Sequence, residues 1–127
     1  MVAEKEVECA EAVEELSRAI GALGLAEEYA RTPRIAARIA SETFSLIKSA
    51  KEKTLLTDEE YERAMGSVAR AIYNLVKLGR VRDAKLELSK AIEALQEAIS
   101  RNLEECLSGV EIKGEIKLEI PELKILI

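Results

Sequence analysis

The sequence predicts a mainly α-helical protein, an antiparallel four-helix bundle followed by a C-terminal β-strand or β-hairpin tail. Over residues 2–107, apolar side chains recur at the three-, four- and seven-residue intervals that share one face of a helix. From Val110 the interval changes to two, the period of a half-buried strand. We therefore expect a helical bundle domain over residues 1–109 and a β tail over residues 110–127.

Length and composition narrow the class of protein. The chain has 127 residues, enough for one domain, and 48% of them are hydrophobic while 3% are aromatic, so the core should be aliphatic. A net charge of −5 argues against a protein that coats nucleic acid through bulk charge. No apolar run approaches the roughly 20 residues that cross a bilayer, and the acidic start of the chain does not resemble a secretory signal. We expect a cytoplasmic protein with no membrane partner.

Local signals set the expected helix boundaries. The first helix should run over residues 2–23, end at Gly21 and Gly24, and lead into a short connector over residues 25–31, for which a helical conformation is the alternative. Thr32 and Pro33 are a good N-cap and first residue for a helix over residues 32–53.

The second half of the bundle has the sharpest signal. Residues 57–60 have the sequence of a capping box, which should begin a helix that ends at Gly79. A last helix is expected over residues 80–107. The periodicity also assigns inward positions, among them Ile35, Val76 and Leu103.

The chain lacks the residues on which most catalytic and metal sites are built. It has no histidine, the commonest general base and metal ligand, so neither a di-metal bundle nor a histidine-dependent ribonuclease motif fits. The six glycines are scattered, so no glycine-rich loop could cradle a phosphate. We expect no enzyme activity, no cofactor and no metal. The alternative is a small enzyme or ligand carrier that uses carboxylate, Lys or Ser side chains.

Two cysteines allow two interpretations. Cys9 and Cys106 lie on apolar faces near the start of the first helix and the end of the last, which are neighbours in an up-down-up-down bundle. They are either buried thiols that act as small apolar residues or a disulfide between the first and last helices, as found in hyperthermophile cells. The 34% of charged residues and the scarcity of amide side chains are typical of a thermophile.

Basic residues gather in the middle of the chain. Residues 31–57 carry a net charge of +4 and residues 63–90 carry +5, whereas residues 1–30 carry −6. Helical spacing places them in two stripes with small hydroxyl and amide side chains, roughly opposite the apolar faces, which suits contacts with phosphates. The first stripe comprises Arg34, Arg38, Ser41, Ser45 and Lys48, and the second comprises Arg63, Ser67, Arg70, Asn74 and Lys77. The alternative is two polar faces that are only solvated. The predicted nucleic-acid contacts are Arg34, Arg38, Lys48, Arg63, Arg70, Lys77, Arg80 and Arg82.

The tail is the predicted assembly element. One or two strands are not stable alone in water, so the tail must cover its own bundle, pair with a second copy, or join the sheet of another protein. We therefore expect an oligomer or a complex subunit. The predicted assembly residues are Val110, Ile112, Ile116, Leu118, Ile120, Leu123, Ile125 and Ile127.

Two stretches of the chain carry a family resemblance. Tyr29–Ala40, and Ala64–Lys77 with its run Val68–Ile72, resemble the helical small subunit of archaeal type I-A CRISPR interference complexes. The resemblance covers about the middle half of the chain. It implies a non-catalytic bundle that packs along the inner face of the effector complex and helps to hold nucleic acid with basic residues.

The sequence thus predicts a non-catalytic helical assembly subunit, which in a nucleoprotein complex would contact the nucleic-acid backbone through basic faces of the second and third helices. The alternative function is a self-associating structural, scaffold or coat protein that oligomerises through its β tail.

Overall fold

A computed structural model describes residues 2–108 of the chain, and side chains from Cys9 to Leu103. This part is mainly helical, as predicted. The predicted β tail and its assembly residues lie outside the described residues. The elements are α1 (Val2–Glu28), α2 (Pro33–Ser41), α3 (Thr43–Glu52), α4 (Asp58–Tyr73), the π-helical turn η1 (Asn74–Leu78) and α5 (Val81–Ser108).

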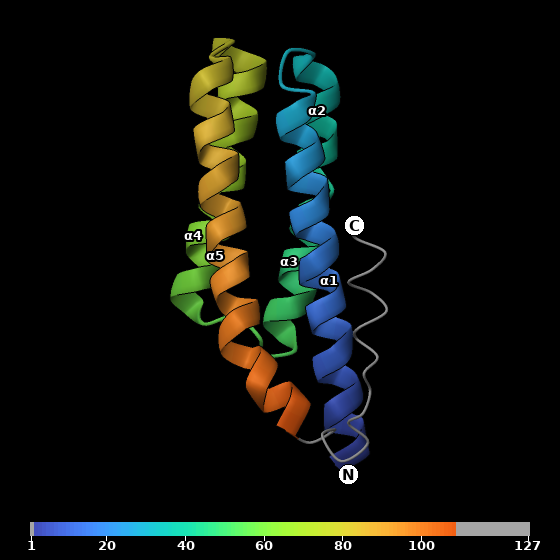
Figure 1. Cartoon of the computed structure of the whole chain (residues 1–127). Helices are drawn as coiled ribbons and strands as arrows, with labels where there is room; N and C mark the ends of the chain where they lie inside the picture. Colours follow the sequence, from blue (N-terminus) through green and yellow to red (C-terminus); the bar gives the residue numbers. More distant parts are fainter. Residues whose placement is uncertain (1, 109–127) are drawn as a thin grey trace.

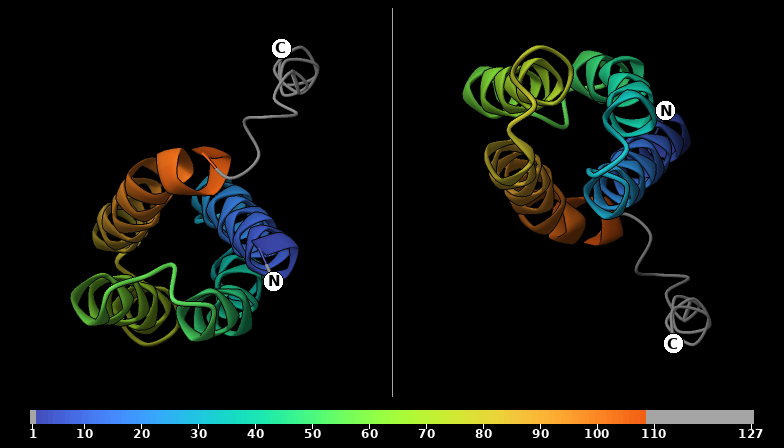
Figure 2. Two further views of the ribbon diagram at one scale, coloured as in Figure 1. Left: turned by 90° about the horizontal axis from the view of Figure 1, so that it is seen from below. Right: turned by 90° about the horizontal axis from the view of Figure 1, so that it is seen from above.

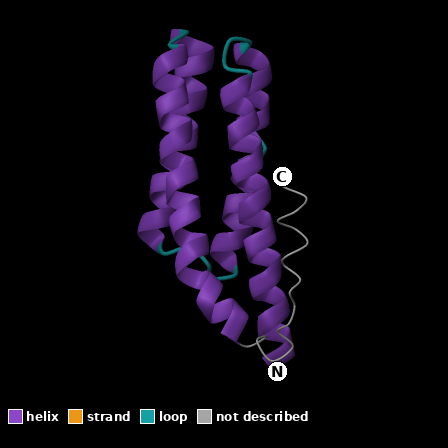
Figure 3. Cartoon of the chain, in the orientation of Figure 1, coloured by secondary structure: helices purple, strands orange, loops and turns teal. Residues whose placement is uncertain are grey.

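The helices lie side by side in four columns (Figures 1 and 2). α1 is the first column, α2 and α3 together form the second, α4 continues into η1 as the third, and α5 is the fourth. Successive columns run in opposite directions, as the colours along the chain show (Figure 1). The described part consists of helices joined by short loops (Figure 3). One end of the bundle therefore holds the end of α1, the start of α2, η1 and the start of α5. The other end holds the start of α1, the end of α3, the start of α4 and the end of α5.

The core is built mainly from alanine. Of the 23 buried apolar residues in the described part, 14 are Ala and seven are Leu. Side chains this small let neighbouring helices approach closely, and a core at native density leaves little room for larger ones. The largest fully buried side chains are Leu16, Leu23, Ile47, Leu75, Leu88, Leu95, Val68 and Thr43.

The predicted end of the first helix at Gly21 and Gly24 is wrong, because α1 continues to Glu28. Its inward face also continues, with Ala26 and Ala30 both buried. The cost of about 1 kcal/mol for each glycine within a helix is offset by this packing, which runs along α1 from Ala12 to Ala26.

The predicted helix over residues 32–53 is interrupted between Ser41 and Thr43. The hydroxyl of buried Thr43 donates to the carbonyl of Ala40 at 2.7 Å, and the hydroxyl of Ser41 donates to the carbonyl of Arg38 at 2.8 Å. Such side-chain bonds compete with the backbone ladder and bend helices. Glu42, between the two helices, keeps a right-handed helical conformation, so the column is interrupted without reversing.

The capping box at the start of α4 is confirmed. The Thr57 hydroxyl accepts from the Glu60 amide, and the Glu60 carboxylate accepts from the Thr57 amide, each at 3.0 Å. At the other end of this column Gly79 follows η1 with φ of 64°, a left-handed conformation in which a Cβ atom is unfavourable. The predicted stop at Gly79 is therefore also confirmed.

Three predicted inward positions are exposed. Ile35, Val76 and Leu103 have exposed fractions of 46%, 53% and 40%. Alanines occupy the buried faces instead, for example Ala36, which lies next to Ile35 and is fully buried. The predicted inward face is therefore wrong at these three positions, although Val68, Ala84 and Leu88, which were also predicted to lie inward, are buried.

Candidate nucleic-acid interface

The first predicted basic stripe is divided between two helices. Arg34 and Arg38 lie one turn apart on α2, and both are exposed. Lys48 is also exposed but lies on α3, about 20 Å along the column from Arg34 at 1.5 Å per residue. Among the described residues, no ion pair engages any of these three side chains.

The second predicted stripe lies along the seam between α4 and α5. Arg63 Nη1 is 3.4 Å from Glu97 Oε1, and Arg70 Nε is 3.2 Å from Glu87 Oε1. Ser67, expected on the outward face, is 3% exposed and accepts a hydrogen bond from Arg70 at 3.3 Å. The expectation that this stripe lies opposite the apolar face is wrong for Ser67, which is buried like Ala64 and Ala71 on the same helix. Arg63, Arg70 and Lys77 are exposed, as expected.

The remaining predicted residues come together at one end of the bundle. Lys77 lies in the last turn of the third column, Arg80 directly precedes α5, and Arg82 lies in its first turn. α2, which carries Arg34, packs against η1 (Figure 2). Two further exposed cations, Arg31 and Lys85, lie at the same end. We call the set the basic end. It comprises Arg31, Arg34, Lys77, Arg80, Arg82 and Lys85.

The electrostatics of the basic end differ from those of the seam. No ion pair within the described part of the chain involves any of its six cations. The acidic residues nearest to it in sequence are Glu27, Glu28, Asp83 and Glu87. Glu27 already accepts a hydrogen bond from Ser89 at 2.8 Å, and Glu87 already pairs with Arg70. The cations therefore exceed the anions, and the excess is exposed to solvent.

Two tyrosines at this end are exposed, which sequence reasoning missed. Tyr29, just after α1, and Tyr73, the last residue of α4, have exposed fractions of 44% and 55%. Each ring is near basic residues in sequence, Arg31 in one case and Lys77 in the other. Aromatic rings among cations are able to stack on the bases of single strands. The sequence signal that could have predicted this exposure is the alanine-rich face of each helix, because it is the buried face and the tyrosines do not lie on it.

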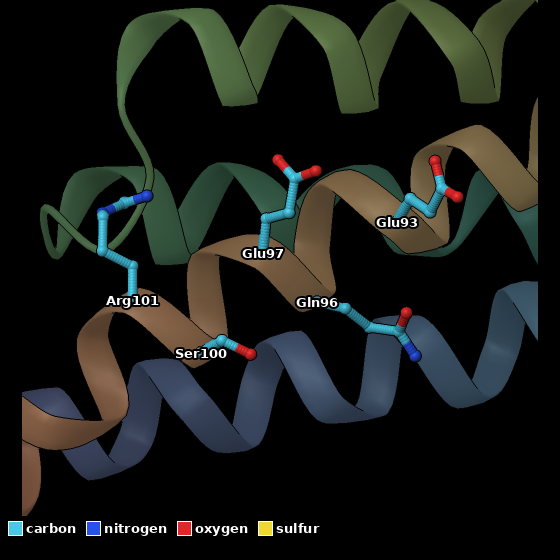
Figure 4. Close-up of a pocket in the computed structure, with 5 residues that line it drawn as sticks. All are labelled: Glu93, Gln96, Glu97, Ser100 and Arg101. Carbon is cyan, nitrogen blue, oxygen red and sulfur yellow. The ribbon is translucent and has the colours of Figure 1, made fainter.

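A shallow pocket lies on the outer surface of α5, far from the basic end (Figure 4). Its lining is polar, and two of its members are committed to the packing of α4, since Glu97 pairs with Arg63 and Arg101 pairs with Glu60. The pocket is lined by Glu93, Gln96, Glu97, Ser100 and Arg101.

Titratable groups show where charge is stabilised. A hydrogen bond between Lys51 and Asp58 raises the pKa of the lysine and lowers the pKa of the aspartate. Both shifts favour the charged forms at neutral pH and fit an ion pair, whereas a general acid or base needs a pKa near neutrality. Within the described residues, no group of three or more Cys, Asp or Glu side chains could hold a metal ion.

Cys9 is disulfide-bonded. The only other cysteine in the sequence is Cys106, whose side chain lies outside the described ones. The predicted Cys9–Cys106 bridge, which would tie the start of α1 to the end of α5, therefore stays a prediction.

Comparisons with family models, with curated proteins and with solved structures found no match to this chain. None of the described helices has both the length and the apolar character of a membrane span.

Proposed function

We propose that this protein is a non-catalytic assembly subunit that binds the backbone of nucleic acid with the basic end of its bundle. The observation that carries the proposal is the meeting of Arg34, Lys77 and Arg80 from three columns as exposed cations outside any described ion pair. Guanidinium and ammonium groups presented in this way suit phosphate oxygens, which position a backbone without reading its sequence.

The proposed phosphate contacts differ from those predicted from the sequence, because they lie at or near one end of the bundle. Arg34, Arg38, Lys77, Arg80 and Arg82 remain, with Arg31 and Lys85 added. Arg63 and Arg70 would first have to leave Glu97 and Glu87. Lys48 is a separate cation on α3. The resemblance to CRISPR small subunits supports this proposal, since basic residues on a helical bundle hold nucleic acid in that family.

The net charge of −5 fits a local contact better than a general coating of nucleic acid. A ligand with dense negative charge would be attracted to the basic end and repelled by the acidic start of α1, where residues 1–15 carry six glutamates and one lysine. The bundle would thus bind with its basic end toward the nucleic acid and the start of α1 away from it. Binding of this kind weakens steeply as salt rises, because phosphate contacts release condensed counterions.

The experiment that tests the proposal compares two double charge reversals by fluorescence anisotropy of a labelled oligonucleotide at low salt. R34E/R80E changes the basic end, and R18E/K90E makes the same charge change at exposed positions of α1 and α5 outside it. We expect R34E/R80E to bind about tenfold more weakly or worse, and R18E/K90E to stay within about twofold of the native chain. Equal effects of the two variants would show that only overall charge matters.

A self-associating scaffold is the second candidate function. Large apolar side chains exposed at the same end of the bundle favour it, since clusters of this kind mark interaction sites.

A further inference from the structure

Exposed apolar side chains are concentrated at the basic end of the bundle. Of the eight large hydrophobic residues that the described part exposes, only Leu103 lies elsewhere. The other seven lie within about six residues of a helix terminus at this end, or about 9 Å along the axis. Single exposed apolar residues are ordinary, but several gathered at one end of a bundle indicate a binding surface. We call it the apolar patch. It comprises Leu25, Tyr29, Ile35, Tyr73, Val76, Leu78 and Leu86.

The opposite end of the bundle carries the opposite charge. The segments that lead to the patch, residues 24–38 and 70–90, contain nine basic and four acidic residues, a net charge of +5. The segments at the other end, residues 1–15, 52–62 and 101–108, contain thirteen acidic and three basic residues, a net charge of −10. Two copies are therefore attracted most strongly when the basic end of one copy faces the acidic end of the next.

An apolar segment of this chain begins at the acidic end. α5 ends at Ser108, and the alternating apolar residues start at Val110. The 28 residues of α5 span about 42 Å, so about twelve extended residues would be needed to return to the patch of the same copy. In a copy stacked head to tail, the patch lies directly beside the point where the segment leaves α5.

We propose that residues 110–127 of one copy bind the apolar patch of a second copy and join the two bundles head to tail. Charge complementarity between the ends and the starting point of the segment both select this arrangement. The interface is heterologous, since it uses two different surfaces, so it continues into an open chain of copies or closes into a ring. The joint places the acidic end of one copy against the basic end of the next, so it would compete with phosphates for these cations and does not depend on the proposed function.

The test uses two full-length variants with complementary defects, without nucleic acid. The patch variant L25E/V76E/L86E keeps the segment, and the segment variant I112S/I116S/I120S keeps the patch. Light scattering after size exclusion should show oligomers for the native chain and monomers for each variant alone. Mixed, the variants should form a 1:1 heterodimer, because one intact patch meets one intact segment. S45E/A69E/Q96E adds the same charge at exposed positions outside the patch and should oligomerise like the native chain.

Several results would overturn the head-to-tail joint. A monomeric native chain would mean that the segment covers its own bundle or serves another protein. Oligomers of the patch variant alone would indicate that segments pair with each other. A mixture that stays monomeric, with both variants retaining native thermal unfolding, would show that patch and segment do not bind. The test contains no nucleic acid, so its result is independent of whether the basic end binds phosphates.

Discussion

Glu60 at the start of α4 and Arg101 near the end of α5 form a two-point ion pair. Arg101 Nη2 donates to Glu60 Oε1 at 2.8 Å, and Arg101 Nη1 donates to the other carboxylate oxygen. Arg101 Nη2 and Asn102 Nδ2 also donate to the Leu55 carbonyl, at 3.3 Å and 2.9 Å. The connection between α3 and α4 is thereby attached to α5. Glu60 also closes the capping box of α4, so one carboxylate stabilises both a helix start and a helix contact.

The first prediction concerns the pH dependence that Glu60 gives to stability. Burial alone would raise its pKa, but the hydrogen bonds from Arg101 and from the Thr57 amide hold the pKa below its ordinary value of 4.5. A carboxyl whose folded pKa lies below its unfolded one contributes stability that is complete above the unfolded pKa. That contribution is lost as the pH falls through the folded pKa.

We expect E60Q to be less stable than the native chain by roughly 1–3 kcal/mol at pH 7, because it removes hydrogen bonds to a charged group. Below pH 4.5 the difference should shrink, since the native chain loses its Glu60 contribution and the variant has none to lose. Urea unfolding across this range measures both effects. Parallel stability curves for the two proteins would rule out this role for Glu60.

The second prediction compares two N-cap threonines. Thr57 accepts a hydrogen bond from the Glu60 amide, whereas Thr32, which precedes α2, makes no capping hydrogen bond through its side chain. T57A should lower the free energy of unfolding by about 1 kcal/mol, and T32A, the matched control, should have a smaller effect. Chemical denaturation of both variants decides the matter, and equal losses would contradict the assigned caps.

These two threonines show what the sequence could and could not predict. Both were expected to begin helices, and both do, because cap preferences depend on residues within one turn. The capping bond itself depends on side-chain geometry and is present only at Thr57. The break after Ser41 was missed, because it depends on the hydrogen bond from the Thr43 hydroxyl to the Ala40 carbonyl, which helical periodicity does not show.

The candidate site was also only partly predictable, because some of its contacts join residues far apart in the sequence. Charge counts identified Arg34 and Arg80, because exposed cations leave a clear local signal. The pairing of Arg63 with Glu97 joins residues 34 positions apart, so no local pattern contains it. The exposure of Tyr73 follows from an alanine-lined core, which large-residue periodicity does not detect.

The third prediction tests the alanine core. Ala71 is fully buried on α4, and Ala69 is exposed on the same helix. A71L should destabilise the bundle by about 1–3 kcal/mol, because the close-packed helices must separate to admit the larger side chain. A69L, which makes the same change in solvent, should stay within about 0.5 kcal/mol of the native chain. Thermal unfolding of both proteins measures the difference, and a tolerated A71L would argue against close packing there.

The fourth prediction concerns the bond at Cys9. If Cys106 is its partner, the denatured, non-reduced chain contains no free thiol. Reduction should then lower stability by several kcal/mol, up to about 4.7 kcal/mol for a loop near 100 residues. The double variant C9S/C106S should be insensitive to reductant. Two reactive thiols in the non-reduced native chain would disprove the bridge.

The measurement that tests the central claim most directly is the salt dependence of duplex binding. With all seven proposed cations on phosphates, a plot of log Kobs against log salt should have a slope of about −6.3. The seven are Arg31, Arg34, Arg38, Lys77, Arg80, Arg82 and Lys85. R34Q/R80Q should reduce that slope by about 2, and R18Q/K90Q should leave it unchanged. A native slope that R34Q/R80Q does not alter, or no binding at low salt, would contradict a phosphate-binding basic end.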